Sequence, residues 1–150
     1  MSFINALLSN QILLAACWAW LVAQILKTII YVIVNKTFNP ERLLGDGGMP
    51  RSHSATVMAL VTSTAYHFGP DTFEFAIAAI LALITMHDAM GVRRETGKQA
   101  KVINNMMDWF VVNSDITPEE KLKEFVGHSP MQVLFGAILG IIVGLVVCNI

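Results

Sequence analysis

Long apolar segments constrain this chain more than any other feature of its sequence. Four of them reach, or nearly reach, the length that crosses a bilayer, and they cover residues 11–34, 54–68, 72–90 and 131–147. Hydrophobic residues make up 55% of the 150 residues and charged residues only 14%, whereas a soluble domain carries about a quarter charged residues. The sequence therefore predicts one all-α membrane domain, residues 1–150, built as a helical bundle with about four transmembrane helices.

The basic residues are distributed unevenly around these segments. All ten lie near the first connection or in the connection between the third and fourth segments: Lys27, Lys36, Arg42, Arg51, Arg93, Arg94, Lys98, Lys101, Lys121 and Lys123. The positive-inside rule then predicts a multi-pass protein of the plasma membrane, with residues 91–130 in the cytoplasm and both termini outside. A net charge of −1 argues against a nucleic-acid partner.

The connection over residues 91–130 contains a helical pattern of its own. Ile103, Met106, Met107 and Phe110 recur at the spacing of one helix face, which predicts an amphipathic helix over residues 94–112. Two positions suit such a helix, one in the headgroup region of the membrane and one across the mouth of the bundle.

The fourth apolar segment has a face of small residues. Gly136, Gly140 and Gly144 follow one another at four-residue spacing, which is typical of helices that pack closely in membranes. This face is a candidate interface for a homodimer.

The stretch "GDGGMPRSHSAT", Gly45 to Thr56, separates the first two apolar segments and brings Arg51, Ser52 and His53 to the start of the second. Polar groups at helix ends inside a membrane bundle are costly unless they are paired or used, so they are functional candidates. Glycine N–H groups, cationic side chains and a helix N-terminus together suit an anion with several oxygens, and phosphate is the natural candidate.

Two histidines at such a site allow a specific mechanism. One attacks phosphorus and the other protonates the departing oxygen, tasks that histidine performs well near neutral pH. Cations nearby would stabilise the charge on the transferring group, and neither a metal nor another cofactor is required. The polar residues expected at this level of the membrane are Lys36, Arg42, Arg51, Ser52, His53, Asp88, Arg93, Arg94, Lys98, His128 and Gln132.

Three blocks in order, "GGMPRSHSA", "HDAMGVRRETGKQA" and "GHSPMQVLFGAILG", resemble a divergent branch of the type 2 phosphatidic acid phosphatase and vanadium haloperoxidase superfamily, made of small bacterial and plastid membrane proteins. The resemblance covers about Gln24 to Gly140. It implies a metal-independent phosphatase that hydrolyses a lipid phosphate or pyrophosphate through a phosphohistidine. His128 would be the nucleophile, His53 the general acid, and Ser52 a ligand of the phosphate oxygens.

The chain departs from the superfamily's pattern in its first motif. Lys36 and Arg42 are separated by five residues instead of six, and Leu43 follows where the superfamily has proline. Lys27 is the other candidate for the lysine of that motif. Arg51 stands where the second motif usually has serine.

The third motif departs as well. Gln132 occupies the position of the aspartate that orients the nucleophilic histidine, and it can orient His128 without stabilising an imidazolium as a carboxylate does. Asp88 is the candidate replacement for that carboxylate. The arginine of the motif falls on Leu122, and Arg93, Arg94 and Lys98 are the candidate replacements.

These departures leave two further functions open. One is a non-catalytic membrane protein that binds or transports an anionic lipid or a soluble phosphate compound, which Gln132 and the irregular first motif favour. The other is a structural partner of a membrane complex that uses the glycine face.

Overall fold

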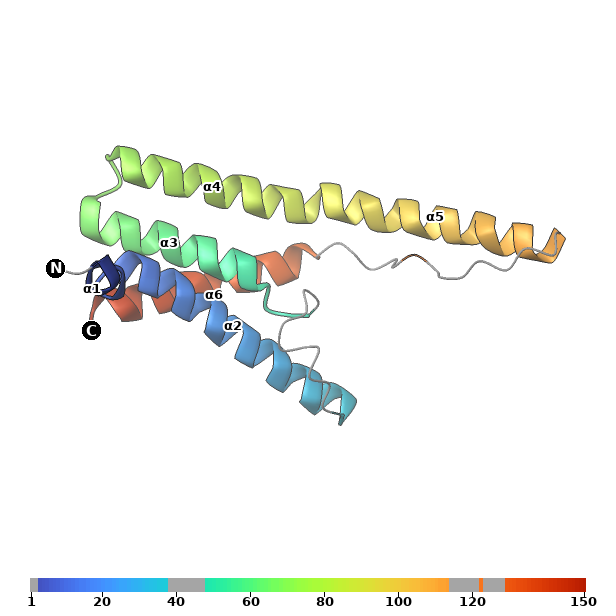
Figure 1. The fold of residues 1–150 in the computed structure, drawn as a ribbon, viewed down its shortest axis with the longest axis horizontal. Coiled ribbons are helices and arrows are strands. Elements are labelled where there is room, and N and C mark those ends of the chain that lie inside the picture. The colour runs from blue at the N-terminus through green and yellow to red at the C-terminus, as the bar shows by residue number, and fades with distance from the viewer. Residues whose placement is uncertain (1–2, 38–47, 114–121, 123–128) are drawn as a thin grey trace.

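The computed structural model describes residues 3–37, 48–113, 122 and 129–150, and over these residues the secondary structure is entirely helical (Figure 1). The helices are α1 (Phe3–Leu8), α2 (Gln11–Asn35), α3 (Ser52–Phe68), α4 (Phe73–Met90), α5 (Val92–Asn113) and α6 (Pro130–Cys148). The all-α prediction is confirmed. Helices α2, α3, α4 and α6 correspond to the four apolar segments, and α5 corresponds to the expected amphipathic helix.

Polar residues immediately before the apolar runs set where three of the long helices begin. The side chains of Asn10, Thr72 and Ser129 each accept a hydrogen bond from a backbone N–H in the first turn of α2, α4 and α6, respectively. These bonds satisfy amide groups that have no partner inside the helix. The segment between α3 and α4 is short, and Thr72 also donates its hydroxyl to the carbonyl of Gly69, at 2.9 Å.

Three helices, rather than four, are long and apolar enough to cross a membrane among the described residues. They are α2, a combined stretch Phe73–Trp109 formed by α4 and α5, and α6. Helix α3 has only 17 residues and is rich in serine and threonine. The expectation of four spans is therefore confirmed for three of them, and the crossing of α3 stays a prediction.

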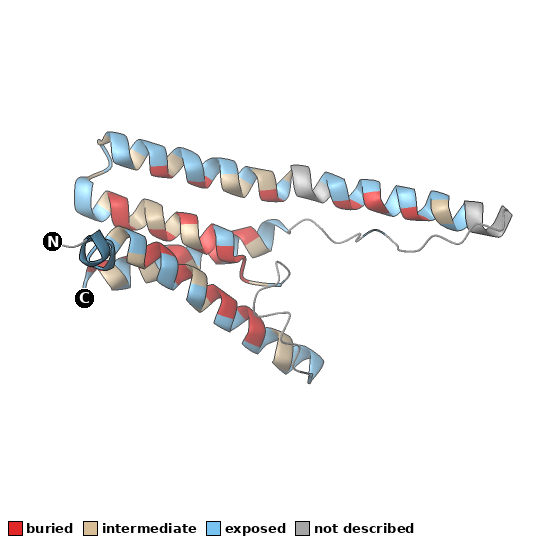
Figure 2. Cartoon of the chain, viewed as in Figure 1, coloured by how far each residue is buried: buried red, intermediate tan, exposed pale blue. Residues whose placement is uncertain are grey.

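Helix α3 lies at the centre of the bundle, where it packs against α2, α4 and α6. Several of its hydroxyl groups bond within the helix: Thr62 donates to the carbonyl of Met58 at 2.8 Å and Thr64 to that of Leu60 at 2.7 Å. Because its neighbours are protein on three sides, α3 can be less apolar than a helix that faces lipid. Figure 2 shows buried residues distributed along α3.

Small residues allow these helices to approach closely. Ala19 and Ala23 of α2 form the core with Ala55 and Ala59 of α3. On α6, Gly136, Gly140 and Gly144 lie directly against the backbone of α3. The glycine face is thus covered by α3 within one chain, which is a different neighbour from the second copy that the sequence suggested.

The bundle has two opposite ends, and the helix ends lie at one or the other of them. Both termini lie at one end of the bundle, while the C-terminal end of α4 and the N-terminal ends of α3 and α6 lie at the other (Figure 1). Helix α5 continues the line of α4 beyond that second end, so it does not cover the mouth of the bundle. Its contacts with other described helices are made with α4.

Candidate functional site

Four buried polar side chains gather where α2 meets the start of α3. Gln24 and Lys27 lie one turn apart on α2 with exposed fractions of 6% and 3%, and Arg51 and Ser52 at the start of α3 are 3% and 7% exposed. The hydroxyl of Ser52 donates to Oε1 of Gln24 at 3.4 Å, which connects the two helices directly. We call these residues the inner polar cluster.

The glycine-rich turn lies against the lysine of this cluster. A Cβ atom placed on Gly48 would come within 2.9 Å of Cγ of Lys27, and Gly48 has a φ of +107°, a conformation that side chains rarely adopt. Glycine is therefore required at position 48 for two reasons, its backbone conformation and the space that the aliphatic part of Lys27 occupies.

Arg51 joins the start of α3 to two other helices. Its backbone N–H donates to the carbonyl of Gln132 in the first turn of α6, at 3.2 Å, and its Nη1 donates to the carbonyl of Thr85 on α4, at 3.1 Å. Asp88 follows Thr85 by about one turn of α4 and is half-buried. The arginine thus holds α3, α4 and α6 together at the end of the bundle that carries the polar residues.

The start of α3 differs from the starts of α2, α4 and α6. Its N-cap residue is Arg51, which makes no side-chain capping bond, and its first turn holds no acidic residue. An uncapped helix start offers N–H groups and the positive end of the helix dipole to an anion. Two buried cations flank this start, Lys27, whose side chain lies against Gly48, and Arg51, whose guanidinium reaches α4; His53 in the first turn of α3 is exposed.

The structure therefore brings together only part of the predicted site. Arg51 and Ser52 belong to the inner polar cluster, His53 follows them on α3, and the first turn of α6 with Gln132 is bonded to Arg51. Asp88 is on the neighbouring helix, one turn from a bond that Arg51 makes.

The remaining predicted site residues either lie away from the inner polar cluster or lie outside the described residues. Lys36 is exposed at the C-cap of α2, about 13 Å of helix rise beyond Lys27. Lys98 is exposed on α5 and forms an ion pair with Glu95. Arg42 and His128 lie outside the described residues, and so do the side chains of Arg93 and Arg94.

The side chain of Gln132 has a specific structural partner. Its Oε1 accepts the backbone N–H of Ser129 at 3.0 Å, while its own backbone N–H donates to the hydroxyl of Ser129 at 3.3 Å. This reciprocal pair is a capping box that starts α6. The amide expected to orient His128 is thus engaged in the helix start one residue further along the chain.

The sequence pattern pointed only weakly to the α2 half of the cluster. Gln24 was not among the predicted site residues, and Lys27 was only an alternative to Lys36. The sequence did contain a sign of this cluster. Gln24 and Lys27 are polar residues within one apolar span, and their spacing of three places them on the same helix face.

Comparison with known proteins identifies the family of this chain and a similar membrane protein. A family model described as the Divergent PAP2 family matches residues 8–143. An uncharacterized membrane protein of Bacillus subtilis (strain 168), YuiD, is 43% identical over 150 aligned positions, which cover 93% of this chain and 95% of that protein. No solved structure matches.

Proposed function

The chain belongs to the Divergent PAP2 family, and from this premise we propose that it is a metal-independent phosphatase acting on a lipid phosphate or pyrophosphate within the membrane. One observation carries the proposal. The uncapped start of α3 lies beside two buried cations, Lys27 and Arg51, and this combination suits a phosphate group. The basic residues of the connections support a cytoplasmic position for this end of the bundle, in the plasma membrane.

In the proposed reaction, the phosphate oxygens accept hydrogen bonds from backbone N–H groups in the first turn of α3, that of Ser52 included, while the two cations balance the charge. A ring nitrogen of His128 attacks phosphorus, and the bond from phosphorus to the lipid oxygen breaks. His53 gives a proton to that oxygen. Water then cleaves the phosphohistidine, which releases inorganic phosphate and restores both histidines.

The positions of the inner polar cluster support separate tasks for its members. Gln24 accepts the Ser52 hydroxyl and so fixes its rotamer, and Arg51 is held by bonds to α4 and α6. Groups that are held in place before the substrate arrives stabilise developing charge without reorganising during the reaction. His53 is exposed, as a group that exchanges protons with the substrate requires.

A second function, binding or transport of an anionic lipid or phosphate compound without hydrolysis, is favoured by a specific observation. The side chain of Gln132 is engaged in the capping box of α6, and the family's aspartate is absent from this position. The same groups would then bind the phosphate compound without hydrolysing it.

Phosphate release separates the two functions. Purified protein in detergent is offered phosphatidic acid, phosphatidylglycerol phosphate and an isoprenyl pyrophosphate, with a chelator present, for wild type and His128→Ala. Release that survives chelation and disappears in His128→Ala supports the phosphatase. If the folded wild-type protein releases no phosphate but binds one of these lipids, the binding function replaces it. Normal hydrolysis by His128→Ala would falsify the histidine mechanism.

A further inference from the structure

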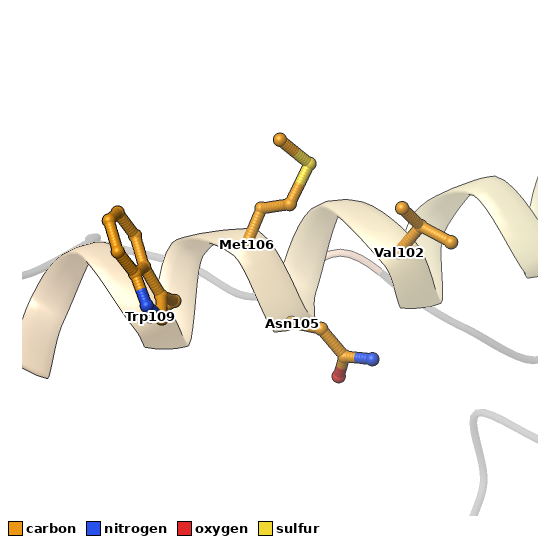
Figure 3. A pocket seen from close by; sticks show the side chains of 4 residues that line it. All are labelled: Val102, Asn105, Met106 and Trp109. Carbon is orange, nitrogen blue, oxygen red and sulfur yellow. The ribbon is translucent and has the colours of Figure 1, made fainter.

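One face of α5 exposes large apolar side chains. Val102, Met106 and Trp109 follow one another at spacings of four and three, and their exposed fractions are 57%, 57% and 63%. With Asn105 they line an open hollow of about 420 Å³ on the helix surface (Figure 3). We call Val102, Met106 and Trp109 the α5 stripe. An exposed apolar stripe of this kind marks a surface that binds something.

The chain's own described packing uses the opposite face of the helix. Gly97, Ala100 and Asn104 are buried, and at about 100° per residue they lie roughly half a turn away from the α5 stripe. The side chain of Asn104 bonds to the backbone of Leu122 twice, to its carbonyl at 2.8 Å and from its N–H at 2.9 Å. These contacts lie on the face opposite the α5 stripe, and the exposed apolar area of the stripe is the surface that a partner would cover.

The charges of α5 favour a lipid surface as that partner. Helix α5 holds four basic residues and two acidic ones, Glu95 and Asp108; Lys98 and Lys101 are exposed, and Lys98 is paired with Glu95. An apolar stripe with a tryptophan, flanked by lysines, is the pattern that binds anionic headgroups and inserts between them. A second copy fits less well, because a parallel pair would bring the same lysines of both chains together.

Helix α5 begins at the end of the bundle where contact with a membrane surface is expected. It follows α4 directly, at the end of the bundle where the polar residues lie (Figure 1). Gly91 between the two helices has φ −95° and ψ −86°, outside the α-helical range. Among the described residues, the backbone bonds that Gly91 itself makes run from its N–H to the carbonyl of His87 and from the N–H of Glu95 to the carbonyl of Gly91.

We propose that α5 turns at Gly91 and lies on an anionic membrane surface, with the α5 stripe inserted among the headgroups. This interaction is separate from the phosphate site and stands whether or not the chain is a phosphatase. It gives the bundle an anchor that responds to the anionic lipid content of the membrane.

Trp109 itself reports on this interaction. The full-length variant Trp18→Phe/Trp20→Phe leaves Trp109 as the only tryptophan, and it is reconstituted into vesicles of phosphatidylcholine with phosphatidylglycerol. The measurements are quenching of Trp109 emission by lipids brominated near the headgroup and by acrylamide in the water. We expect the brominated lipid to reduce the emission at least two-fold, and acrylamide to quench it weakly.

Matched charge variants test the role of the anionic lipid. In this background, Lys101→Gln lowers the ratio of inserted to water-exposed Trp109 by roughly five-fold, the effect of one lysine near such a surface. Lys36→Gln makes the same charge change at the end of α2 and leaves the ratio unchanged. Quenching by acrylamide alone overturns the proposal, because α5 then stands in water. Protection from both quenchers overturns it too, because protein then covers the stripe.

Discussion

The contact between α6 and α3 predicts a large cost for adding one methyl group at Gly140. A Cβ atom there would lie 2.3 Å from the carbonyl oxygen of Ala55, about 1 Å short of ordinary contact, which begins at 3.4 Å. Backbone atoms cannot rotate away, so the two helices must separate. Overpacking of this kind costs about 1–3 kcal/mol, against a gain of about 1 kcal/mol from the better helix propensity of alanine. Because the clash involves backbone atoms, we expect the net cost near the upper end, so that Gly140→Ala lowers the free energy of unfolding by up to about 2 kcal/mol.

Gly144 provides the matched control for this prediction. The nearest atoms to a Cβ at Gly144 are Cβ of Thr62 at 3.0 Å and the backbone of Ala59 at 3.2 Å, so a shift of a few tenths of an ångström suffices. The gain in propensity then offsets the packing cost, and Gly144→Ala stays within about 1 kcal/mol of wild type. Reversible unfolding in detergent by increasing sodium dodecyl sulfate, followed by circular dichroism, measures both. Equal stability of the two variants would refute the packing argument.

Three other predictions concern single residues. Lys27→Met lowers phosphate release or lipid-phosphate binding at least ten-fold, whereas Lys36→Met stays within about two-fold, measured with the same panel of lipid phosphates. Gln132→Ala removes half of a capping box and lowers the free energy of unfolding by about 1 kcal/mol, while Gln132→Glu, which retains an acceptor, stays close to wild type in the same unfolding titration. Asn104→Ala removes both bonds to Leu122, and limited proteolysis should then cleave the connection near that residue several-fold faster than in wild type.

The positions of the helices could be predicted because their signals are local. Apolar runs of membrane length, with Asn10, Thr72 and Ser129 in front of them, determine where α2, α4 and α6 begin without reference to the rest of the chain. The amphipathic pattern located α5 for the same reason. The direction of α5 relative to α4 depends instead on the backbone angles at Gly91, and the spacing of apolar residues does not predict these angles.

The composition of the site was harder to predict because it depends on contacts between helices. The superfamily motif suggested Lys36, but the depth at which α2 crosses α3 brings Gln24 to Ser52 and Lys27 to Gly48 instead. Likewise, a row of glycines indicates close packing without saying which helix approaches. Two adjacent candidates, α3 of the same chain and a second copy, give the same sequence pattern.

The central position of α3 has a consequence for how the protein is made. A helix of 17 residues with several hydroxyl groups partitions poorly into lipid by itself, so its insertion depends on neighbours that shield it. Helix α2 is synthesised before α3 and is apolar enough to insert alone, but the glycine face of α6 is synthesised after α3. The polar start of α3 is therefore shielded only once α6 has been made, and a chain truncated before Pro130 would present quality-control proteases with an unshielded polar helix.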